Sequence, residues 1–154
     1  GLKWPNDLDA GGLKMGGDHA EALSSEKGPC SMVLGVGINV RPLGAGAPAE
    51  LSGMSTSIES VVGGSASLLE AADCAVAGLE TWLPGAPAAL DGDLLALVDR
   101  YDWLRDRRAR LALPGSEDSQ PGTCVGIAPD GALLFRPDRG ALRRVTDGVV
   151  DPWT

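Results

Sequence analysis

Apolar and polar positions alternate over the first forty residues in the manner of β-strands. Leu2–Trp4 reads as the end of a strand that Pro5 stops, because proline donates no ladder hydrogen bond. Residues 13–23 form a second predicted strand, and residues 31–40 form its hairpin partner after a polar turn over residues 24–29. Asn6 and Asp7 fall between the first two strands, so we place them on a loop.

The middle strand contains an unusual polar pair. Asp18 and His19 occupy positions where a buried strand would carry aliphatic side chains. We therefore expect this strand to be exposed at an edge of its sheet. His19 is interpreted as a solvent-facing side chain.

Helical spacing replaces this alternation after residue 55. Ser55-Thr56-Ser57 can cap a short helix through about Val62, which Gly63-Gly64 ends. Ser65 can cap a longer helix that Pro84-Gly85 terminates. The apolar residues of the longer helix recur at helical spacing: Leu68, Leu69, Ala72, Val76, Leu79 and Leu83. A third helix is predicted over residues 86–104.

Short alternating segments and tight turns fill the remainder. The predicted strands cover residues 109–113, 123–128, 132–136 and 142–146. This spacing suits a small antiparallel barrel of about fifty residues. The chain is thus predicted to be α+β, with a mixed sheet and helices over residues 1–105 and a small β-barrel over residues 106–154.

Composition narrows the classes of function. The 154 residues include 13 basic and 21 acidic side chains, giving a net charge of −8 that disfavours nucleic-acid binding through this portion. The three cysteines are far apart and show no metal-ligand spacing, and no long apolar run predicts a membrane segment. We expect a reducing, cytoplasmic location. The chain begins at Gly1 two residues before its densest motif, so we expect an upstream portion to be missing.

The polar motifs contain cations and amides but no obvious base. They are Lys3-Trp4-Pro5-Asn6-Asp7, the isolated Lys14, and Gly35-Val36-Gly37-Ile38-Asn39. No nucleophile elbow, P-loop or dinucleotide fingerprint is present. Such a set suits a reaction that needs positioning and charge neutralisation, as when a carboxylate attacks the α-phosphate of a nucleotide. A lysine between the two anions lowers their repulsion, and one carboxylate with phosphate oxygens can hold Mg²⁺.

These motifs resemble the second half of the catalytic domain of biotin protein ligases. The resemblance implies a class II synthetase-like catalytic domain, incomplete at its N-terminal side, followed by an SH3-like barrel. It implies ATP-dependent activation of biotin to biotinyl-5'-AMP and transfer to a lysine of biotin carboxyl carrier protein, a subunit of acetyl-CoA carboxylase. ATP and Mg²⁺ would be the cofactors, no membrane would be involved, and a homodimer is allowed.

The resemblance also assigns residues. Lys14 matches the catalytic lysine that bridges the biotin carboxylate and the adenylate phosphate. Gly17, Gly35 and Gly37 match the glycines that approach biotin. Nucleotide contacts fall on Trp4, Asn6, Asp7 and Asn39, and Asp7 would also hold the metal ion.

Two departures from the family pattern leave other functions open. The long glycine-arginine loop of the family is not in this sequence, and the segment after Gly17 reads Asp18-His19-Ala20-Glu21 where the family is aliphatic. The alternatives are a non-catalytic fragment or module that binds a carrier domain, and a related lipoate or octanoyl transferase.

Overall fold

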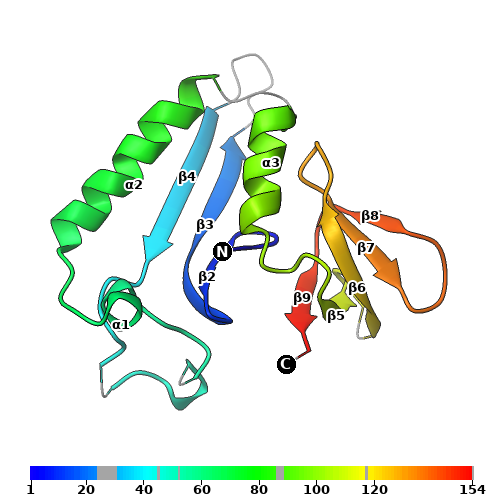
Figure 1. The fold of residues 1–154 in the computed structure, drawn as a ribbon, viewed down its shortest axis with the longest axis horizontal. Coiled ribbons are helices and arrows are strands. Elements are labelled where there is room, and N and C mark those ends of the chain that lie inside the picture. The colour runs from blue at the N-terminus through cyan, green and yellow to red at the C-terminus, as the bar shows by residue number, and fades with distance from the viewer. Residues whose placement is uncertain (24–30, 45, 52, 86–88, 117, 154) are drawn as a thin grey trace. The chain divides into compact units, whose positions relative to one another are not determined.

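The computed structural model describes the whole chain except residues 24–30, 45, 52, 86–88, 117 and 154 (Figure 1). It divides into two compact units, one formed by Asn6–Gly85 and the other by Gly1–Pro5 with Ala86–Thr154. The strand ladders in both units are antiparallel, and the predicted α+β class is confirmed. The predicted domain boundary after residue 105 stays a prediction.

The unit Asn6–Gly85, here called the sheet unit, is built on three adjacent strands. They are β2 (Asp7–Ala10), β3 (Leu13–Leu23) and β4 (Ser31–Ile38), hydrogen-bonded in that order. Gly11 and Gly12 join β2 to β3 with φ of +66° and +86°, a two-residue hairpin turn that favours glycine. The predicted loop at Asp7 was wrong, because this residue begins β2. The predicted turn over residues 24–29 lies outside the described residues.

A bulge in β3 decides which side chains share a face of this sheet. Leu8 pairs with Gly16, and the next residue of β2, Asp9, pairs with Lys14, so Met15 has no opposite residue. Directly paired residues lie on the same face, whereas neighbours along a strand lie on opposite faces. The extra residue therefore moves Lys14 to the face that carries Gly17 and its partner Asp7.

Asp18 and His19 are exposed, as predicted, but not because β3 lies at an edge of the sheet. β3 is central in the strand order, between β2 and β4. Its length explains the exposure. The backbone N–H of Asp18 donates to Asn6 O at 2.9 Å, and within the described sheet unit the rest of β3 pairs with β4 alone.

The helices of the sheet unit bury little of their surface. α1 (Ile58–Val62) begins after its cap Ser57, one of the three predicted capping residues, and ends at Gly63 with φ of +69°, as predicted. α2 (Leu68–Trp82) is capped by Ser67, two residues later than expected, because the Ser67 hydroxyl accepts from the Glu70 N–H. Neither helix contains a buried residue. Two short 3-10 helices complete the unit, η1 (Ala49–Leu51) and η2 (Leu83–Gly85).

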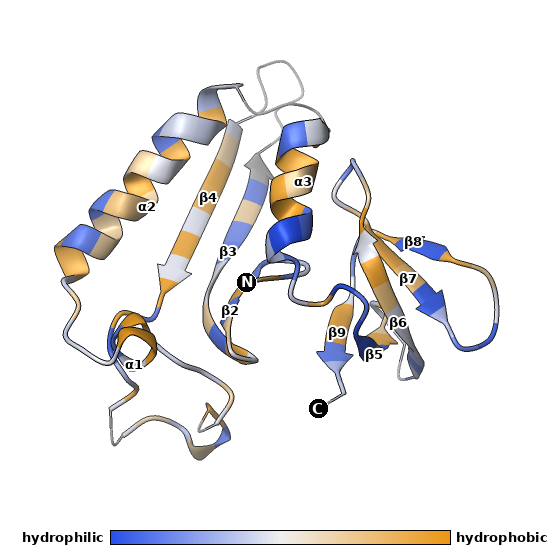
Figure 2. Cartoon of the chain, in the orientation of Figure 1, coloured by the Kyte–Doolittle hydropathy of each residue, from blue (hydrophilic) through white to orange (hydrophobic). Residues whose placement is uncertain are grey.

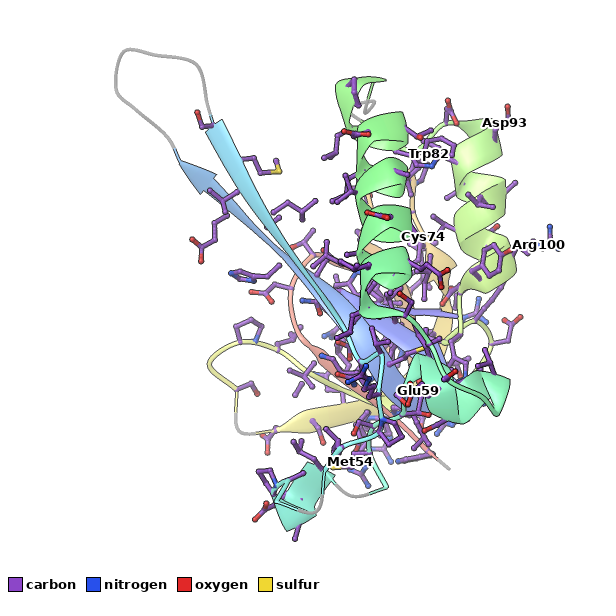
Figure 3. All side chains as sticks on the ribbon, turned by 90° about the vertical axis from the view of Figure 1, so that its left-hand side faces the viewer. Met54, Glu59, Cys74, Trp82, Asp93 and Arg100 are labelled. Atoms are coloured by element: carbon purple, nitrogen blue, oxygen red, sulfur yellow. The ribbon has the colours of Figure 1, made fainter. Side chains whose placement is uncertain are left out.

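Apolar side chains therefore lie open on α2 and β4. Leu69 is 77% exposed and Met32 is 66% exposed. Apolar bands run along both elements in Figure 2, and Figure 3 labels Cys74 and Trp82 on α2. No described helix has the length and apolar character needed to span a membrane. Cys74 and Cys124 are unpaired, and Cys30 lies outside the described residues.

The second unit, here called the barrel unit, contains the remaining elements. They are β1 (Leu2–Lys3), α3 (Gly92–Tyr101), β5 (Arg108–Ala112), β6 (Ser119–Ile127), β7 (Leu133–Pro137), β8 (Arg143–Val145) and β9 (Val149–Pro152). α3 is shorter than predicted, since Asp91 caps its start and its last residue is Tyr101. Four of these strands were predicted with shifted ends, whereas β9 was not.

The five later strands form one sheet in the order β8-β7-β6-β5-β9. Its end strands do not pair with each other within the described residues, so closure into an SH3-like barrel stays a prediction. One face of this sheet covers a dense core that includes Leu104, Leu111, Leu133, Phe135 and Val150, each at most 2% exposed.

Candidate functional site

Asp7 and Lys14 form an ion pair on one face of the sheet unit. The Asp7 side chain is 17% exposed and the Lys14 side chain is 54% exposed, so the ammonium group stays accessible to solvent. The bulge at Met15 makes this pair possible, because a regular strand would direct Lys14 to the opposite face from Asp7. Lys14 is further held by its backbone, which donates to Met54 O at 3.0 Å and accepts from the Thr56 N–H at 2.9 Å.

Gly17 lies beside this ion pair and has a structural reason to be glycine. A Cβ atom at this position would lie 2.8 Å from the backbone oxygen of Asn6 and 3.5 Å from Lys14 Nζ. Real Cβ contacts are longer than 2.8 Å, so any larger residue would displace β2 or the strand itself. Because Gly17 has no side chain, Asp7 on β2 and Lys14 on β3 can approach each other beside it.

Gly35 and Gly37 lie on one face of β4, and the described structure does not require glycine at either position. They pair directly with His19 and Gly17, and neither has a positive φ. The nearest atom to an added Cβ would be 3.8 Å away at Gly35 and 3.9 Å away at Gly37. Neither chain packing nor backbone conformation therefore demands glycine at these positions. A glycine in a strand often marks a place where a ligand approaches the backbone closely.

We call the surface formed by Gly17, Gly35 and Gly37 the glycine face. It forms part of an open depression of about 640 Å³, whose lining also includes Lys14, His19 and Asn39. A flat or extended ligand can lie against bare backbone here, with an anionic group against the Lys14 ammonium. The site suits binding and charge neutralisation, because its cation is solvent-accessible and its floor carries no side chains.

The two asparagines predicted to contact nucleotide hold backbone segments together in this structure. Asn6 Nδ2 donates to Asp18 O at 2.7 Å and so fastens the start of β2 to β3. Asn39 Nδ2 donates to Thr56 O at 3.1 Å, and the Asn39 backbone N–H donates to Met15 O at 2.8 Å. Both residues thereby support the strand that carries Lys14. Their contact with a nucleotide stays a prediction.

Trp4 lies in the barrel unit, whereas Asn6 and Asp7 of the same motif lie in the sheet unit. Its ring is 9% exposed and belongs to the core that contains Leu104 and Phe135. Its indole N–H donates to Gly131 O at 3.1 Å. The peptide bond to Pro5 is cis. Trp4 therefore belongs to the core of this unit, and its predicted nucleotide contact stays a prediction.

Metal binding would rely on Asp7. No group of three or more histidine, cysteine, aspartate or glutamate side chains that could hold a metal ion occurs among the described residues. Asp7 supplies one carboxylate next to an accessible lysine. Mg²⁺ is commonly held by one or two carboxylates together with substrate phosphates, so these residues fit a magnesium ion that arrives with a nucleotide.

The sequence analysis missed His19 as part of this surface. His19 follows Gly17 by two residues, which places both on one face of β3, and it pairs with Gly35. The alternation alone could have indicated the shared face. Its position opposite Gly35 required the pairing register of β3 with β4, which alternation along one strand does not give.

Comparison with known proteins bears on the fold. The sequence matches no protein-family model, and a search of curated proteins finds no match. Among solved structures, the apo biotin protein ligase from Aquifex aeolicus is similar to 99% of this chain, with a TM-score of 0.80 and 19% sequence identity. The ligase from that organism in complex with biotin and ATP is also similar over 99% of the chain, with a TM-score of 0.67 and 19% identity.

This chain spans 65% of the first of these structures and 61% of the second. The similarity includes both units, since only about one residue in a hundred of the chain lies outside it. The motif resemblance and the similarity to solved structures therefore agree. The chain has the fold of the corresponding part of a biotin protein ligase.

Proposed function

We propose that the chain is the C-terminal part of a biotin protein ligase. The complete protein would activate biotin with ATP to biotinyl-5'-AMP and transfer the biotinyl group to a lysine of biotin carboxyl carrier protein. The observation that carries this proposal is the glycine face with the Lys14 ammonium at its side. The fold shared with a ligase that was crystallised with biotin and ATP supports it.

In the first step, a carboxylate oxygen of biotin attacks the α-phosphorus of ATP. An O–P bond forms to give the mixed anhydride, and the bond from this phosphorus to pyrophosphate breaks. Lys14 lowers the barrier because its ammonium group lies between two anions that otherwise repel each other. Asp7 orients this ammonium group, and its carboxylate would hold the magnesium ion of Mg-ATP, which would screen the phosphate charge.

In the second step, the ε-amine of the carrier lysine attacks the carbonyl carbon of the anhydride. A C–N amide bond forms, the C–O bond to AMP breaks, and the amine loses a proton to solvent. Lys14 would stabilise the departing phosphate in the same way as it stabilises the first anion. Asn6 and Asn39 fix the backbone around Lys14, and we propose that their amide oxygens help to orient the substrates.

Biotin-dependent exchange of labelled pyrophosphate into ATP tests the first step directly. We expect exchange in the full-length protein and its loss in Lys14→Ala, while Arg41→Ala, which removes another exposed cation of the sheet unit, retains it. The result against the proposal is absence of exchange in the wild-type protein, or equal exchange in Lys14→Ala.

The same measurement separates the alternatives. A lipoate or octanoyl transferase would show no biotin-dependent exchange of pyrophosphate into ATP. It would show either lipoate-dependent exchange or no exchange. A non-catalytic module would bind the carrier domain without exchange. The cytoplasmic location and the homodimer stay predictions from the sequence.

A further inference from the structure

His19 and Glu21 form a polar pair on the glycine face, at the end away from Lys14. His19 Nε2 lies 3.0 Å from Glu21 Oε1, and both side chains are largely exposed. Alternation along β3 places both residues on the face of Gly17, and His19 pairs with Gly35. The imidazole therefore stands opposite a position that has no side chain, and it lines the same depression as Lys14.

Glu21 determines which ring nitrogen of His19 faces a ligand. An ionised carboxylate can only accept hydrogen bonds, so a neutral imidazole beside it carries its proton on Nε2. This leaves the Nδ1 lone pair as an acceptor. The other charged groups on this face are Lys14, Asp7 and Asp9, further along the strands, and β4 contains no titratable residue.

We propose that His19, oriented by Glu21, is a specificity-determining residue that accepts a hydrogen bond from an N–H group of the ligand. The inference rests on the proposed function and names the part of the substrate that this residue recognises. His19 lies two strand residues beyond Gly17, a separation of about 7 Å. A ligand whose carboxylate meets Lys14 beside Gly17 would present a group at the far end of the glycine face to His19.

Biotin has the required chemistry, because it carries a carboxylate at one end and a cyclic urea with two N–H groups at the other. A straight-chain fatty acid such as octanoate has the carboxylate alone. An apolar wall discriminates poorly between such ligands, whereas a positioned hydrogen-bonding group favours the ligand that satisfies it. His19 would therefore favour biotin over octanoate without contributing to carboxylate binding.

Calorimetric titration of the full-length protein with biotin and with octanoate tests this inference. We expect His19→Leu to weaken biotin binding about tenfold, the usual effect of losing one hydrogen bond, and to leave octanoate binding unchanged. His19→Gln, whose amide oxygen can accept, should recover part of the affinity for biotin. Asp18→Asn, which changes the adjacent residue of β3, serves as the matched control and should bind both acids normally.

Substitution of Glu21 adds a test of the orientation of the imidazole. Glu21→Gln should weaken biotin binding, because an amide can donate to Nε2 and so places the proton on Nδ1.

The outcomes distinguish this inference from the proposed function. If wild type binds biotin and His19→Leu binds it equally well, the inference is wrong and the proposed function stands. If His19→Leu weakens octanoate as much as biotin, His19 does not determine specificity. If the wild-type protein does not bind biotin, both proposals fail.

Discussion

The two units of this chain use their apolar residues in opposite ways. The barrel unit encloses Phe135, Leu133 and Leu111 almost completely beneath one five-stranded sheet. The sheet unit leaves Leu69 and Met32 more than half exposed, and its helices bury no residue. Burial of apolar surface is the main stabilising contribution to folding, so we expect the barrel unit to gain more stability from its apolar residues than the sheet unit does.

The sheet unit is organised instead by backbone hydrogen bonds around the candidate site. Asn6 ties β2 to β3, Asn39 ties the segment before α1 to β4, and Lys14 exchanges backbone bonds with residues 54 and 56. The residues that form the site are thus also those that hold its strands together. The comparison teaches that the buried apolar core and the candidate site are separated in this chain, since each lies in a different unit.

The largest expected effect comes from emptying the core of the barrel unit. Phe135→Ala should reduce the free energy of unfolding by about 3–5 kcal/mol, because the ring is fully buried and leaves a cavity. Leu69→Ala, which shortens an exposed side chain of α2, should change it by less than about 0.5 kcal/mol. Urea unfolding followed by circular dichroism measures both values, and equal losses would remove the contrast between the units.

Substitutions at two glycine positions, Gly122 and Gly35, give smaller effects. A Cβ at Gly122 would lie 2.5 Å from Arg136 O and overlap the Phe135 ring, so Gly122→Ala should cost about 1–3 kcal/mol. Gly35→Ala meets no atom within 3.8 Å and should leave the free energy of unfolding unchanged. Gly35→Val should fold normally but fill the glycine face and abolish biotin binding. A destabilised Gly35→Ala protein would show that this glycine is needed for folding.

The smallest effect concerns Asp102, which follows α3 in the barrel unit. Burial raises the pKa of its carboxyl, against the opposing hydrogen bond from the Leu104 N–H, and its Oδ2 has no partner among the described residues. The folded state therefore binds more protons than the unfolded chain, and stability falls as pH rises through the raised pKa. Asp102→Asn should be more stable than wild type at pH 7.

That advantage should shrink as the pH falls from 7 toward 4, because the raised pKa lets the wild-type carboxyl take up a proton more readily in the folded protein than in the unfolded chain. Urea unfolding of both proteins at the two pH values measures the difference. A constant difference between wild type and variant would contradict the assigned pKa direction.

The sequence predicted where helices and strands occur better than it predicted which side chains share a face of the sheet. The hairpin of β3 and β4, the caps at Ser57 and Gly63, and four strands of the barrel unit follow from alternation, helical spacing and turn residues. β9 escaped prediction because its four residues contain a single buried position, Val150. The cap of α2 shifted from Ser65 to Ser67 because either serine can begin the same apolar repeat.

The candidate site shows the same limit more sharply. The motif residues Asp7, Lys14 and Gly17 were identified from their types, yet simple alternation places Lys14 and Gly17 on opposite faces. Only the bulge at Met15 brings them together, and nothing in the local sequence specifies it. The position of His19 opposite Gly35 depends in a similar way on the pairing register of β3 with β4, which alternation along one strand does not give.

The central claim is that the Lys14 ammonium binds the carboxylate of biotin beside the glycine face. Calorimetric titration of the full-length wild-type protein, Lys14→Ala and Arg41→Ala with biotin tests it most directly. The account predicts saturable binding in the wild-type and Arg41→Ala proteins, and binding weakened at least about tenfold in Lys14→Ala, as expected for the loss of a charge-assisted hydrogen bond. Equal affinity in all three proteins would contradict it.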